Sequence, residues 1–99
     1  MLTINKTIEN DTTVFTLAGR LDTTTAPELE QEVKTSLSGV SELVMDMKEL
    51  DYISSAGLRV LLSAHKVMNK QGSMTIRNAN DTIMEIFEVT GFSDILTIE

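Results

Sequence analysis

The stretch Asp51-Tyr52-Ile53-Ser54-Ser55-Ala56-Gly57-Leu58 predicts the central strand-to-helix transition of this 99-residue chain. It follows the apolar run Leu43-Val44-Met45 and leads into a helical pattern that continues to about Lys70. Two adjacent serines therefore lie where a loop becomes a helix. The first backbone N–H groups of a helix lack partners within it, and the helix dipole is positive there. A serine hydroxyl can cap the helix at this place, and a phosphate would be stabilised by the same donors.

Strand and helix patterns alternate on both sides of this transition. Apolar periodicity predicts five strands, at residues 2–8, 13–18, 43–47, 73–77 and 95–98. It also predicts three helices. The first begins with a Thr25-Ala26-Pro27-Glu28 capping box and ends at Ser38-Gly39, the second ends at Gln71-Gly72, and the third begins within 78–81 and ends at Gly91.

Each predicted helix has one apolar face that should pack on the sheet. These faces are Ala26, Leu29, Val33 and Leu37; Leu58, Leu61, Leu62, His65 and Met68, widened by Val60, Ala64 and Val67; and Ile83, Ile86, Phe87 and Thr90. The element order ββαβαβαβ favours an antiparallel first hairpin followed by parallel strands with right-handed crossovers. We therefore expect one α/β domain over residues 1–99, with a mixed, mostly parallel five-stranded sheet and three main helices.

Charge and composition limit the classes of partner. The chain has 8 basic and 15 acidic residues, a net charge of −7 and no cysteine. An acidic surface repels phosphate backbones and anionic lipid, so nucleic acid and membrane surfaces are disfavoured and a protein with a basic patch is the better partner. The first residues lack a basic region followed by a long apolar one, so we expect no signal peptide. No apolar run reaches about 18 residues, and the absence of cysteine fits a reducing cytoplasm.

Polar residues are expected to meet at the carboxyl ends of the parallel strands, where ligands and partners bind open α/β sheets. Asp22 and Thr23 follow the second strand, Asp46 ends the predicted third strand, and Ser54-Ser55 precede the second helix. Spacing alone is equally compatible with structural roles: the loop residues could form turns, Asp46 could accept from loop amides, and either serine could be only an N-cap.

Catalytic and metal chemistry find little support. The only histidine, His65, lies about three helical turns beyond Ser55 on the apolar face, which predicts a partly buried core histidine rather than a base. There is no Cys/His cluster for zinc and no Gly-rich phosphate loop. Asp22 and Asp46 could in principle bind Mg²⁺ and accept a phosphoryl group, as in receiver domains, but the acidic pair that receiver domains carry at the end of their first strand is missing. We therefore expect no enzyme activity, no metal and no cofactor.

The chain resembles a STAS domain, and specifically a bacterial anti-sigma factor antagonist. Three segments carry the resemblance, with Thr90-Gly91-Phe92 near the end in agreement: Gly19-Arg20-Leu21-Asp22, Leu43-Val44-Met45-Asp46 and Tyr52-Ile53-Ser54-Ser55-Ala56-Gly57-Leu58. The resemblance implies a partner switch that regulates transcription indirectly, as in stress responses. An anti-sigma factor that is also an ATP-using serine kinase binds the unmodified antagonist and releases its sigma factor. Phosphorylation breaks the complex, and a serine phosphatase restores it.

The resemblance also implies the site residues. The serine two positions before the motif glycine is the phosphorylated one, which is Ser55 here, with Ser54 as second choice. The implied partner-binding residues are Asp22, Thr23, Asp46, Ser54, Ala56, Gly57, Leu58 and Arg59. Departures from the family pattern are Ser54 where Asp is common, Arg20 where Glu is frequent and Arg59 where many members have Gly.

Two further expectations complete the sequence-based account. Gly57 costs stability in a first helical turn, so we expect its missing side chain to let a partner approach closely. The free chain is expected to be a cytoplasmic monomer. The alternative function is a constitutive interaction or scaffold domain, for example one associated with a transporter, in which Ser55 is only a helix cap.

Overall fold

A computed structural model describes all 99 residues. Its sheet has four strands in the order β1-β2-β3-β4, formed by Leu2–Glu9, Thr12–Leu21, Glu42–Ile53 and Ser73–Arg77. β1 pairs antiparallel with β2, whereas β2, β3 and β4 pair parallel. The helices are α1 (Ala26–Ser36), α2 (Ser55–Gln71) and α3 (Asp81–Thr90), followed by the short 3-10 helix η1 (Phe92–Asp94). The predicted hairpin, parallel pairing and three main helices are confirmed.

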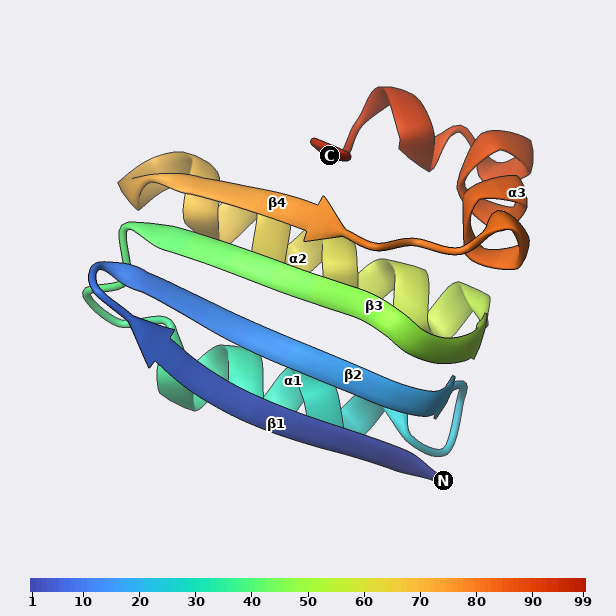
Figure 1. Ribbon diagram of the computed structural model, residues 1–99, viewed down its shortest axis with the longest axis horizontal. Helices are drawn as coiled ribbons and strands as arrows, with labels where there is room; N and C mark the ends of the chain where they lie inside the picture. Colours follow the sequence, from blue (N-terminus) through green and yellow to red (C-terminus); the bar gives the residue numbers. More distant parts are fainter.

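The two longer helices lie on one side of the sheet. Figure 1 shows α1 and α2 behind the strands, with no helix on the opposite face, and α3 beyond the carboxyl end of β4. The core between the sheet and these helices includes Phe15, Met45, Leu29, Leu61 and Phe87, all fully buried. Burial of these side chains away from water is the main force that holds the helices on the sheet.

The predicted helix faces are largely confirmed. All four residues predicted for the inner face of α1 are buried, as are most of those predicted for α2. The exceptions on α2 are Leu62 and His65, which are half-buried, and Val67, which is 40% exposed. On α3, Ile83 and Phe87 are buried and Ile86 is half-buried, but Thr90 is exposed and its hydroxyl donates to the carbonyl oxygen of Ile86.

The predicted fifth strand at 95–98 is wrong. Residues 92–94 form η1, and the chain then makes only one parallel bridge, between Ile76 and Ile98. The Ile76 N–H donates to Thr97 O at 2.8 Å and the Glu99 N–H donates to Ile76 O at 2.9 Å. The N–H groups of Ile95 and Leu96 donate to the carbonyl oxygen of Phe92, so these two residues continue the turn of η1 and do not pair with β4.

The third strand is longer than predicted, and Asp46 lies within it rather than at its end. Against β2, one extra residue enters β3 between Asp46 and Glu49 and another between Leu50 and Tyr52. These bulges place Met47, Leu50 and Ile53 on the core side at every third position. The strand therefore continues to Ile53 after its alternation of apolar and polar residues has ended.

Candidate functional site

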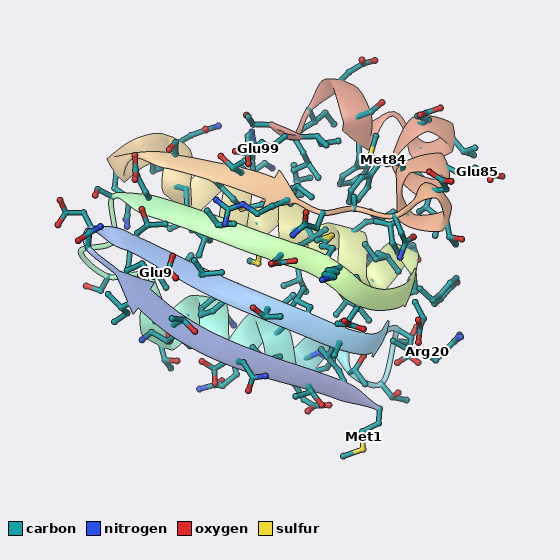
Figure 2. The ribbon with its side chains drawn as sticks, in the orientation of Figure 1. Met1, Glu9, Arg20, Met84, Glu85 and Glu99 are labelled. Atoms are coloured by element: carbon teal, nitrogen blue, oxygen red, sulfur yellow. The ribbon has the colours of Figure 1, made fainter.

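The site lies at the end of the sheet where β2 and β3 extend beyond β4. The loop after β2 and the start of α2 meet there, because the Ser54 N–H donates to the carbonyl oxygen of Leu21 at 2.8 Å. β4 stops opposite Asp46 and does not reach this end, whereas β2 and β3 do, together with the start of β1, where Leu2 pairs with Gly19. Figure 2 shows Arg20 at this end of the molecule. Two segments more than thirty residues apart in sequence thus form one rim.

The two serines at the start of α2 have different roles. Ser54 is the N-cap in extended conformation, and its Oγ accepts from the Gly57 N–H at 3.4 Å. Ser55 is the first helical residue, is exposed, and forms no side-chain hydrogen bond. The alternative role of Ser55 as the helix cap is therefore excluded, because Ser54 takes that position. The Ser55 hydroxyl is left free at the surface, next to the positive end of the helix.

Asp22 organises the loop between β2 and α1. Its Oδ1 accepts from the Thr24 hydroxyl at 2.7 Å, from the Thr24 N–H at 3.0 Å and from the Thr25 N–H at 3.1 Å. The hydrogen bond from the Thr24 hydroxyl, helped by those from Thr25 and the Thr24 N–H and opposed by partial burial, lowers the pKa of Asp22 to about 2. Hydrogen bonds to the ionised carboxylate favour that form. Asp22 is therefore a structural anion that fixes the shape of the loop.

The predicted capping box at Thr25 does not form. The Thr25 hydroxyl is buried, accepts from the Asp22 N–H at 2.8 Å and donates to Arg20 O at 2.8 Å, so it makes no capping bond to α1. The free N–H groups before α1 donate instead to Asp22. The sequence pattern correctly predicted where α1 begins. It predicted Thr25 as the acceptor of the free N–H groups there, whereas the acceptor is Asp22.

An arginine–tyrosine contact at this end was not predicted. Arg20 and Tyr52 are paired in register between β2 and β3, and the guanidinium lies 4.5 Å from the centroid of the Tyr52 ring. The Arg20 Nε also lies 3.7 Å from Asp22 Oδ2. A cation over an aromatic face is attracted by the negative charge of the ring face. Only the strand register, which depends on the two bulges in β3, reveals this contact.

Gly57 and Leu58 do not belong to an exposed contact surface. Gly57 is buried, and a Cβ there would lie 2.6 Å from Leu21 Cγ and 3.0 Å from Leu21 O. Leu58 is 5% exposed and belongs to the core. The expectation that Gly57 leaves room for a partner is therefore corrected: the space is filled by Leu21 of the same chain.

Asp46 is not at this rim either. It lies seven residues before Ile53, which at roughly 3.3 Å per residue is about 20 Å away. Its Oδ1 accepts from the Lys48 N–H at 3.0 Å and from Asn78 Nδ2 at 3.2 Å. Asp46 thus stabilises local backbone near the end of β4. Asp22 and Asp46 do not converge, so no paired-carboxylate site for a metal exists here.

The remaining predicted residues do come together. Thr23, Ala56 and Arg59 line one cleft between α1 and α2, with a volume of about 460 Å³. Ser54 and Ser55 lie at the start of the same helix. The exposed surface at this end therefore consists of the Asp22 loop, the two serines, Ala56 and Arg59. It offers hydroxyl groups and charges of both signs but no nucleophile–base pair.

His65 is half-buried on α2, as predicted. Its Nδ1 is buried without a hydrogen-bond partner. It lies ten residues beyond Ser55 on α2, which at about 1.5 Å per residue is roughly 15 Å. The structure contains no group of three side chains that could hold a metal ion, and none of its helices is long and apolar enough to cross a membrane.

Comparison with known proteins assigns the family. The family model of the STAS domain matches residues 3–99. This chain belongs to the STAS domain family. The STAS domain is 32% identical over 91 residues to the anti-sigma-B factor antagonist of Bacillus subtilis, covering 91% of this chain and 83% of that protein.

Two solved structures share the fold of this STAS domain. An anti-sigma factor antagonist from Mycobacterium paratuberculosis superposes with a TM-score of 0.91 at 20% identity, over 99% of this chain and 85% of that one. The phosphorylated form of the Bacillus cell fate determinant SpoIIAA gives a TM-score of 0.74 at 17% identity, over 100% of this chain and 91% of that one. At these identities the likeness establishes the fold alone.

Proposed function

We propose that this STAS domain is an anti-sigma factor antagonist whose binding to an anti-sigma factor is controlled by phosphorylation of Ser55. The observation that carries the proposal is the division of roles between the two serines. Ser54 caps α2, whereas the Ser55 hydroxyl is exposed and makes no hydrogen bond. A kinase can therefore modify Ser55 without removing the cap. The relationship to a curated anti-sigma-B factor antagonist supports the same function.

The contact surface is the rim formed by the Asp22 loop and the start of α2. Thr23, Ser54, Ser55, Ala56 and Arg59 are the residues that would touch the anti-sigma factor. Several of these side chains are short, so a partner can approach the backbone at the start of α2. The rigid Asp22 loop holds one side of this surface in place, which limits the entropy lost on binding.

Phosphorylation changes this surface without refolding the domain. The partner holds ATP, whose γ-phosphoryl group is transferred to Ser55 Oγ. The bond from the γ-phosphorus to the bridging oxygen of ADP breaks, the hydroxyl proton passes to solvent and ADP leaves. The phosphate adds roughly −1.5 to −2 charges and three acceptor oxygens. The start of α2 tolerates that charge, because the helix dipole and free N–H groups favour an anion there. The bound partner loses both space and electrostatic complementarity, and a serine phosphatase reverses the change in the bacterial cytoplasm.

The test uses an anti-sigma factor kinase isolated by affinity capture on the immobilised, unmodified protein. Incubation with that kinase and ATP should add one phosphate, seen by intact mass spectrometry and mapped to Ser55. Ser55→Ala should take up none, whereas Ser54→Ala should still be modified. Modification confined to Ser54 would reject the site. A protein that binds its partner equally well with and without ATP, and is never modified, would support a constitutive interaction domain instead.

A further inference from the structure

The two arginines near the serines differ in whether they have partners. Arg20 is engaged by Asp22 and by the Tyr52 ring. Arg59 is exposed and forms no ion pair. The cations in the ion pairs of the structure are Arg20, Lys34 and Arg77. Arg59 is therefore the arginine at this end that is free to bind a new anion.

The position of Arg59 on α2 directs it toward Ser55. Ser55 is the first residue of the helix and Arg59 lies four positions later. Residues at this spacing lie on the same helix face, with Cβ atoms about 5–6 Å apart. Helical side chains tilt toward the N-terminus, so the long side chain of Arg59 leans back toward the turn that carries Ser55. Arg59 also lines the cleft, together with Ala56 and Thr23.

Few acidic groups compete for Arg59. α2 carries Arg59, Lys66 and Lys70 but no acidic residue, although the chain has 15 acidic residues. On the β2–α1 loop, the Asp22 carboxylate is already bonded by Thr24, Thr25 and Arg20. On α1, Glu30 lines the same cleft but pairs with Lys34 at 3.4 Å. On β3, Asp51 is exposed and forms no ion pair.

We propose that Arg59 is the internal counter-ion of phosphorylated Ser55. This inference rests on the proposed phosphorylation of that residue. The planar guanidinium matches two phosphate oxygens and binds them with charge-assisted hydrogen bonds. The phosphate is then held against α2, and Arg59 is withdrawn from the surface that an unmodified domain presents. Phosphorylation would thus add a negative charge to the contact surface and remove a positive one in the same step.

The test needs no kinase, so it is independent of the proposed function. Phosphoserine is incorporated at position 55 during translation, and the second pKa of the phosphate is followed by ³¹P NMR. Arg59 should lower this pKa, so Arg59→Gln should raise it by about 0.5. Lys66→Gln makes the same charge change about two helical turns beyond Arg59 and should leave the phosphate pKa almost unchanged. Arg59→Lys should give an intermediate value, because it keeps the charge but loses the paired donors.

Each outcome separates this inference from the proposed function. If Arg59→Gln and Lys66→Gln change the phosphate pKa equally, Arg59 acts only through general charge and the counter-ion proposal is rejected. The kinase could still modify Ser55 in that case, and the switch would stand. Circular dichroism of each variant verifies that the fold is unchanged, which the exposure of both side chains predicts.

Discussion

The Ser54 N–H donates to the carbonyl oxygen of Leu21 at 2.8 Å, and this bond joins the end of β2 to the start of α2. Leu21 also occupies the space that a side chain at position 57 would need. The bond and this contact fix the first turn of α2 relative to the Asp22 loop. The exposed Ser55 therefore lies on a fixed part of the backbone, and we expect a change of charge there to alter partner binding without moving that backbone.

Gly57→Ala should destabilise the domain. The new methyl group would lie 2.6 Å from Leu21 Cγ and 3.0 Å from Leu21 O, so the packing must shift. Overpacking of this kind costs about 1–3 kcal/mol. Urea denaturation measures it, with Ser63→Ala at an exposed position of α2 as the matched control. A Gly57→Ala protein as stable as the parent would show that the first turn is looser than the structure indicates.

The two serines should differ in their contribution to stability. Ser54→Ala removes the N-cap acceptor of the Gly57 N–H and should cost about 0.5–2 kcal/mol. Ser55→Ala removes an exposed hydroxyl with no hydrogen bond and should change the free energy of unfolding by less than about 0.5 kcal/mol. Urea denaturation of the two variants tests the order. A larger loss of stability in Ser55→Ala than in Ser54→Ala would show that Ser54 is not the cap.

Asp22 should make the domain more stable as pH rises from about 2 to 4. Its pKa is lowered from 3.8 to about 2 in the folded state, chiefly by the Thr24 hydroxyl. The unfolded chain therefore binds more protons in this window, and the Asp22 contribution is complete above it and lost as pH falls through it. Asp22→Asn should flatten the dependence of the unfolding midpoint on pH there. Asp51→Asn, an exposed carboxylate without a hydrogen bond, is the control. Equal slopes in the two variants would contradict the assignment.

The fold was predictable from sequence where apolar periodicity was regular. The inner face of α1, most of that of α2, the antiparallel hairpin and the parallel order follow from spacing and chain order. The end of β3 was missed because two bulges change its inward spacing from two to three residues, at Met47, Leu50 and Ile53. The fifth strand was predicted because residues 95–98 have strand composition, but composition does not reveal that η1 leaves them only one bridge.

The candidate site was predicted in part for similar reasons. The positions of Asp22, Thr23 and the two serines follow from chain order, and the structure brings them together. Asp46 was misplaced along with the end of β3. Gly57 was misinterpreted because its neighbour Leu21 lies 36 residues earlier in the chain, and only the structure shows the contact. The Arg20–Tyr52 pair depends on the bulged register and has no local sequence signal.

The central claim is that phosphorylation of Ser55 controls partner binding. The most direct measurement is isothermal titration calorimetry of the anti-sigma factor against unmodified protein and protein carrying phosphoserine at position 55. We predict at least tenfold weaker binding after modification, about 1.4 kcal/mol. Ser55→Ala should bind like the unmodified protein, and Ser55→Asp should weaken binding only in part, since it carries less charge and bulk. Equal affinity of the phosphorylated and unmodified proteins would contradict the switch.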